Sequence, residues 1–190
     1  MSYPPRSDSS DWLEGFLFDR RMTVVRGTLD DALATRVATE LMTLDALGDD
    51  PVTMQVDCAG GSLTAALTLV DVIGVLGVPV NSLCMGRVEG VGVAVVAVTS
   101  SRQALSHTQF AMSDPELSFS ARASEAEGLA RVQMDLLDRY HQVLARATKR
   151  PLAEIEQWCD ARSTFGAAEA MSRGIIDEIS RGRAGLRRIR

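Results

Sequence analysis

Few side chains in this chain have the chemistry of a nucleophile, a general base or a metal ligand. The sequence holds two histidines, His107 and His141, and three cysteines, Cys58, Cys84 and Cys159. The cysteines lack the close spacing of a zinc site, and their odd number argues against a disulfide framework. We therefore expect reduced thiols in the cytoplasm, no metal and no cofactor. Each histidine is interpreted as structural rather than as a catalytic base.

These residues lie among alternating strands, glycines and helices. The helix expected over 90–98, GVGVAVVAV, is apolar on all sides and must be buried in the core. Other helices begin near Thr28, Pro151 and Gly166 and over the apolar stripe of 63–75. Strands are expected at 22–25, 52–56, 78–85, 102–112 with a turn near His107, and 175–179, and two of them end at Gly60–Gly61 and Gly86. Repeated strand-glycine-helix units predict βαβ crossovers and an α/β fold.

Composition narrows the class of protein. The 190 residues are 46% hydrophobic and 24% charged, which is typical of a globular chain of one domain. The longest apolar runs fall short of the roughly 18 residues that span a bilayer, so we expect no membrane contact. A net charge of −5 makes nucleic acid an unlikely partner, because phosphate contacts need a basic surface.

One expected helix is too long to be covered by its own domain. The pattern over about 123–148 has one broad apolar face, and some 25 residues at about 1.5 Å each reach close to 40 Å. This helix should protrude and bury its apolar face against a partner. It belongs to a domain predicted over 15–180, between a flexible arm at 1–14 and a basic tail at 181–190. A solvated end is the favoured interpretation of that tail, with a partner contact as the alternative.

Three segments in order carry a family likeness: DCAGGSLTAAL at 57–67, CMGRVEGVG at 84–92 and FGAAEAMSRGIIDEI at 165–179. Together they resemble ClpP, the proteolytic subunit of the ATP-dependent Clp protease, a serine peptidase of crotonase-like fold. The likeness extends from about Phe18 to Ile179. It implies repeated β-β-α (βαβ) units, with the long helix in the place of the family's protruding handle helix.

The family's catalytic triad is missing at the matching positions. The nucleophilic serine belongs to a Met-Gly-x-x-x-Ser-x-Gly turn, where this chain has Gly90. The histidine lies two residues before a proline, where this chain has Ser113, and the aspartate position matches Ser163. One extra residue nearby leaves Asp160 as the alternative third position. Without a base to take its proton, a hydroxyl does not attack an amide, so the resemblance implies an inactive homologue.

Other groups near these positions suggest two alternatives. The family's oxyanion hole is made of backbone N–H groups, which match Gly61 and Val91 and do not depend on side chains. A cleft that binds a peptide without cutting it is therefore one alternative. The other is a hydrolase or lyase rebuilt around Glu89, with Ser113 and Arg87, because a carboxylate can act as a general base. Against this, Glu89 can instead form an ion pair with Arg87 or Arg162.

The resemblance also implies partners. It implies heptameric rings, stacked in pairs as a tetradecamer through the handle helices, made of this chain alone or mixed with an active paralogue. The contacts between subunits are expected at Arg162, Glu125, Leu129, Leu136 and Tyr140. Docking of a Clp ATPase is doubtful, because Thr53 and Gln55 stand where the family has aromatic residues of its docking pockets. The leading hypothesis is a structural or regulatory subunit of a Clp-type protease.

Overall fold

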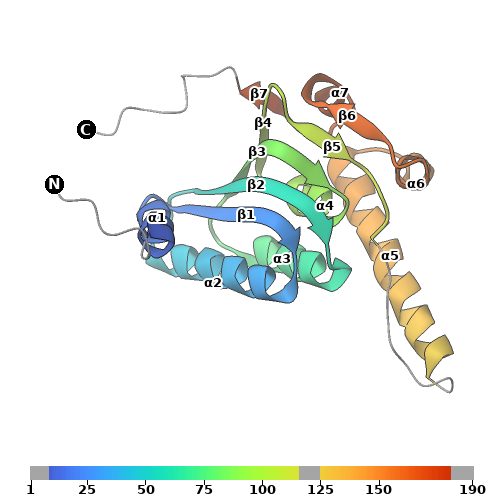
Figure 1. The fold of residues 1–190 in the computed structure, drawn as a ribbon, viewed down its shortest axis with the longest axis horizontal. Helices are drawn as coiled ribbons and strands as arrows, with labels where there is room; N and C mark the ends of the chain where they lie inside the picture. Colours follow the sequence, from blue (N-terminus) through green and yellow to red (C-terminus); the bar gives the residue numbers. More distant parts are fainter. Residues whose placement is uncertain (1–8, 116–124, 181–190) are drawn as a thin grey trace.

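The fold is organised around a seven-stranded sheet, with helices of the βαβ crossovers packed against it (Figure 1). The computed structural model describes residues 9–115 and 125–180, with side chains from residue 14 onward. The strand order along the sheet is β1-β2-β3-β4-β7, and each strand in this order is parallel to its neighbours. These strands are β1 (Met22–Leu29), β2 (Val52–Gly61), β3 (Val80–Glu89), β4 (Ser101–Leu105) and β7 (Glu178–Ser180). The predicted α/β fold with parallel crossovers is confirmed.

The first three crossovers run through helices of different character. They are α2 (Asp31–Leu47), α3 (Leu63–Val75) and α4 (Val91–Ala97). All seven residues of α4 are buried, as its uniformly apolar sequence predicted. It contacts β2 and β3 of the sheet as well as α3 and α5 (Ala126–Thr148). This buried helix therefore fixes the end of β3, where the expected nucleophile turn lies.

Two predicted boundaries near glycines and caps were wrong. β1 continues to Leu29, and the N-cap of α2 is Asp30 instead of Thr28, because the Asp30 carboxylate accepts a hydrogen bond from Leu33 N at 2.8 Å. Gly86 does not end β3 but lies inside it at φ +61°, beside a register shift between β2 and β3. A glycine at positive φ accommodates such a bulge without breaking the strand.

The C-terminal part departs most from the sequence prediction. A short antiparallel pair, β5 (Gln109–Ala111) and β6 (Thr164–Gly166), lies outside this strand order, and β5 also runs parallel to β3. Pro151 is the N-cap of α6 (Leu152–Asp160), and Gly166 that of α7 (Ala167–Ser172). The strand expected at 175–179 is displaced to β7, because Ile175 and Ile176 are buried in the core before the pairing with β4 begins.

The 23-residue helix α5 extends away from the sheet at its N-terminal end (Figure 1). Its C-terminal half packs against α3, α4 and α6. The protrusion predicted from its length is thus confirmed. At the other end of the chain, helix α1 (Ser9–Phe18) lies by β1, so residues 9–14 of the expected flexible arm are helical.

The basic tail at 181–190 lies outside the described residues, as do residues 1–8 of the arm. Within the described ranges, no helix combines the length and the apolar composition that a membrane crossing requires.

Candidate functional site

A cleft of about 610 Å³ lies at the carboxyl ends of β2, β3 and β5. Because these strands are parallel neighbours, their ends meet at one edge of the sheet, where open α/β sheets commonly bind ligands. Most lining residues come from the last residues of β2, β3 and β5 and from the residues directly after β3 and β5. They are Ala59, Gly60, Gly61, Glu89, Gly90, Val91, Ala111, Met112, Ser113, Asp114, Pro115, Arg162 and Thr164.

Gly90 occupies the turn between β3 and α4 in a backbone conformation that favours glycine. Its φ of 47° and ψ of −121° place it in the left-handed half of φ/ψ space, and its N–H donates to Ala111 O at 2.8 Å. A Cβ at this position would lie 3.3 Å from Ser113 Oγ. The structure therefore brings two of the three triad-equivalent positions, Gly90 and Ser113, into direct proximity across the cleft.

Ser163, the third triad-equivalent position, is held by its backbone next to the same segment. Its carbonyl accepts a hydrogen bond from Met112 N at 2.8 Å, and its N–H donates to Trp158 O at 2.9 Å. Its neighbours Arg162 and Thr164 line the cleft, whereas Ser163 itself does not. Asp160, the alternative, is the exposed last residue of α6. Both assignments of the third position stay predictions.

The Glu89 carboxylate forms an ion pair with the Arg87 guanidinium, two residues earlier on the same face of β3. The hydrogen bond from Arg87 to Glu89 raises the pKa of the guanidinium above its usual value. Of the two arginines considered from the sequence, Arg87 is thus the partner, while Arg162 lines the cleft with a positive φ of 48°. The Glu89 carboxylate is thus already engaged by a neighbouring cation, which counts against an active site rebuilt on it.

The predicted oxyanion-hole residues, Gly61 and Val91, both line the cleft. Gly61 has φ +141° and so little room that a Cβ would lie 2.2 Å from Leu29 O. This close approach of two strands explains the glycine without any ligand. The oxyanion role of the two N–H groups stays a prediction.

Of the predicted subunit contacts, Arg162 lines the cleft and stays a prediction as a contact, and the other four lie on α5 or just before it. Leu129 and Leu136 are half-buried, and Glu125, just before the helix, is exposed. Tyr140, in contrast, is 0% exposed within its own chain, and its hydroxyl donates to Ser113 O at 3.3 Å. Its assignment as a subunit contact was therefore wrong, because the C-terminal half of α5 packs into the core. Val132 and Met134, each 53% exposed, are the large apolar side chains that the helix leaves uncovered.

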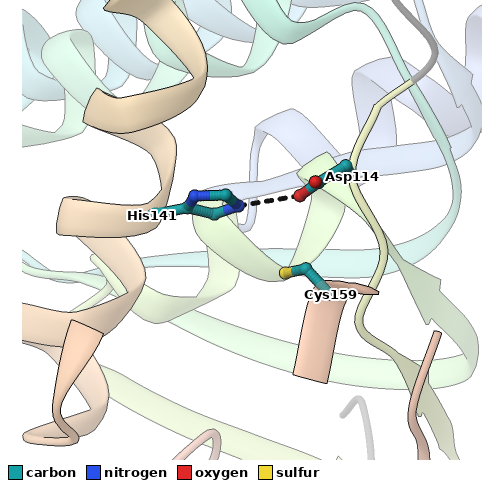
Figure 2. Close-up of side chains that lie close together, drawn as sticks. All are labelled: Asp114, His141 and Cys159. Atoms are coloured by element: carbon teal, nitrogen blue, oxygen red, sulfur yellow. Dashed lines mark hydrogen bonds and ion pairs between the residues drawn. The ribbon is translucent and has the colours of Figure 1, made fainter. Parts of the chain in front are cut away.

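A polar cluster that the sequence analysis missed adjoins the cleft. His141 Nε2 lies 2.7 Å from Asp114 Oδ1, and Cys159 Sγ is close to both (Figure 2). The three residues come from α5, the segment after β5, and α6. Since they are separated along the chain and follow no ligand spacing, only the packing of α5 on α6 reveals the cluster. His107, by comparison, is exposed in the turn between β4 and β5.

Comparison with known families adds an independent result. A family model described as Clp protease matches residues 6–183 of the chain. The match covers the sheet, the cleft and α5 together.

Proposed function

The chain belongs to the Clp protease family, and from this premise we propose that it is a catalytically inactive subunit with a structural or regulatory role in a Clp-type ring assembly. The observation that carries the proposal is Gly90. It stands at the turn where the family's motif has its nucleophilic serine, and its missing side chain would point toward Ser113. A hydrogen atom cannot attack a carbonyl carbon, so the first step of acyl transfer has no nucleophile here.

The second catalytic role is also vacant among the described residues. Ser113 holds the place of the base, and a hydroxyl is protonated at neutral pH and accepts no proton from a neighbouring alcohol. No histidine lines the cleft in the described part of the chain. Two roles would thus have to be restored together before the cleft could hydrolyse a peptide bond.

The exposed part of α5 supports assembly. A helix that projects from the domain leaves Val132 53% exposed on the face that it shares with the half-buried Leu129 and Leu136, and a partner can bury this face. Members of the family assemble into ring oligomers. We propose that α5 contacts a second subunit, either a copy of this chain or an active paralogue, in stacked heptameric rings formed by the domain over 15–180. Three free, buried cysteines agree with a cytoplasmic setting.

The cleft itself supports a second candidate, a non-catalytic peptide-binding role. Its volume of about 610 Å³ is within the usual range of small-ligand sites. Peptide binding is compatible with the first proposal, because an inactive subunit in a ring can still hold a substrate. A hydrolase or lyase based on Glu89 is less favoured, since the carboxylate is paired with Arg87.

The test is to rebuild the triad. We expect the variant Gly90→Ser, Ser113→His, Ser163→Asp to cleave a fluorogenic peptide, and a version with Asp160 as the only third-position carboxylate separates the two assignments. The matched control carries Gly90→Ala with the other two changes, which supplies the same bulk without the hydroxyl. Native mass spectrometry of each variant reports folding and assembly. If the triple variant with Gly90→Ser folds and assembles but does not hydrolyse the peptide, the cleft lacks more than the triad side chains, and the proposal is contradicted.

A further inference from the structure

The cluster of Asp114, His141 and Cys159 has the composition of a metal site. One imidazole nitrogen, one thiol sulfur and one carboxylate oxygen lie within 4.8 Å of one another. The side chain of His141 is 8% exposed and residue Cys159 is 2% exposed, whereas Asp114 is 35% exposed and lines the cleft. Two of the three side chains, drawn in Figure 2, are therefore buried, and Asp114 is partly exposed at the cleft.

The donor set selects the type of metal. Mixed nitrogen, sulfur and oxygen ligands suit Zn²⁺, while Ca²⁺ and Mg²⁺ prefer oxygen alone. The thiolate of Cys159 and the carboxylate of Asp114 would together carry two negative charges, and the neutral imidazole of His141 none. A divalent ion then makes a site of zero net charge, which is the arrangement that a poorly hydrated environment tolerates best.

The geometry requires only small movements. In a tetrahedral zinc site, ligand atoms at about 2.0 to 2.3 Å from the metal are roughly 3.3 to 3.8 Å apart. The Asp114–His141 pair, at 2.7 Å, must open slightly, and the sulfur must move inward from a separation of at most 4.8 Å. The Asp114 side chain is partly exposed and therefore has room to rotate away from His141.

We propose that Asp114, His141 and Cys159 bind one Zn²⁺ ion, which joins the segment after β5 to α5 and α6. The ion forms bonds to one oxygen of Asp114, Nε2 of His141 and Sγ of Cys159. The thiol loses its proton to solvent, and the imidazole proton shifts from Nε2 to Nδ1, so that one proton is released per ion bound. A fourth position stays open for water on the side of the cleft.

Neighbouring groups hold these ligands in place. Tyr140 precedes His141 on α5, with the two rings 5.4 Å apart at 47°. Its hydroxyl donates to the carbonyl of Ser113, the residue before Asp114. Hydrogen-bonded groups behind the ligands orient them toward a metal. Tyr140 is thus a positioning residue for both His141 and Asp114.

The experiment is titration of the full, tag-free chain with Zn²⁺ after treatment with a chelator. Isothermal titration calorimetry in two buffers of different ionisation enthalpy should give one ion and about one released proton per chain. Titration with Co²⁺ should give the d–d bands of a tetrahedral ion and a thiolate-to-cobalt charge-transfer band. Absence of the thiolate band from the wild-type protein would overturn the proposal, whatever the variants do.

Variants assign the ligands. Cys159→Ser, His141→Gln and Asp114→Asn should each weaken Zn²⁺ binding at least about tenfold, and Cys159→Ser should abolish the charge-transfer band. Matched controls change the same residue types elsewhere: Cys84→Ala, His107→Gln and the exposed neighbour Asp160→Asn. These should bind as the wild type does. Circular dichroism checks that each variant is folded, and unchanged binding in folded Cys159→Ser and His141→Gln would contradict the site.

Discussion

The hydroxyl oxygen of Ser113 lies 3.3 Å from the point at which a side chain on Gly90 would begin. The contact joins the turn after β3 to the segment after β5, which are neighbours because β3 and β5 pair in parallel. The parallel pairing of β3 and β5 therefore places the two positions that the family motif assigns to the nucleophile and the base side by side. The strands β3 and β5 determine where positions 90 and 113 lie, and the residue types at these two positions determine what chemistry they can perform.

The backbone at Gly90 has a measurable energetic preference. We expect Gly90→Ala to lower the free energy of unfolding by about 1 to 2 kcal/mol, because a residue with a Cβ is strained at φ 47°. Urea denaturation measures the change. The control is Gly128→Ala in α5, where an added Cβ meets nothing within 4 Å. It should stabilise the chain by up to about 1 kcal/mol, and equal effects at both positions would contradict the assignment of strain.

Exposed apolar residues of α5 should govern assembly. We expect Val132→Glu and Met134→Glu to dissociate the oligomer while leaving the subunit folded, because both side chains are half-exposed in the single chain. Native mass spectrometry and circular dichroism together measure the two properties. Met42→Glu, at a similarly exposed position on α2, is the control and should keep the assembly. If both α5 variants still assemble, the interface between subunits does not lie on α5.

The pairing of Asp177 with Arg102 should make stability depend on pH in acid. Arg102 donates to the Asp177 carboxylate through its backbone N–H at 2.9 Å and its Nε at 3.0 Å. These bonds from Arg102 lower the pKa of Asp177 from 3.8. The stabilisation is therefore complete above the pKa of the unfolded chain and is lost as pH falls through the lower pKa of the folded one.

We expect Asp177→Asn to cost about 0.5 to 1 kcal/mol at neutral pH, because the carboxylate is half-exposed and screened by solvent. The difference from wild type should shrink as pH drops below 3.8. Denaturant unfolding at several pH values measures it. Arg131→Gln removes a solvated pair with Glu127 and leaves the first turn of α5 intact, so it should change little. A difference that grows in acid would contradict the lowered pKa of Asp177.

Buried thiols should resist modification. Burial raises the pKa of Cys84 to about 12, and burial also raises that of Cys58. The reactive thiolate is thus scarce at neutral pH, and reagents cannot reach it. Iodoacetamide labelling followed by peptide mass spectrometry should show neither residue modified in the folded chain and both modified in urea. Met42→Cys, on an exposed site of α2, is the positive control.

The sequence predicted the helices whose hydrophobic pattern matches their burial in the fold. The GVGVAVVAV segment became the fully buried α4, and the length of the handle pattern predicted the protrusion of α5. Short elements were missed for a physical reason. β6 has three residues, too few for a period, and forms because β5 offers it an antiparallel edge. Ile175 and Ile176 look like the start of a strand but are buried before pairing begins.

The candidate site was predictable only where it depends on a continuous motif. The turn at Gly90 and the segment through Ser113 were located from the sequence and lie together in the cleft. Tyr140 was misassigned because the apolar face of α5 packs into the core at the C-terminal end of the helix and is exposed to solvent at the N-terminal end. The cluster of Asp114, His141 and Cys159 depends on contacts among three separate elements, which no spacing along the chain encodes.

The two hydrogen bonds from α5 to the segment after β5 give the protruding helix an energetic connection to the cleft. Tyr140 holds the carbonyl of Ser113, and His141 holds the carboxylate of Asp114. A partner that displaces α5 must therefore also shift the floor of the cleft. By thermodynamic reciprocity, a ligand that moves these residues would change the affinity for such a partner by the same factor. In the proposed inactive subunit, this connection would let a neighbouring subunit respond to the occupancy of the cleft.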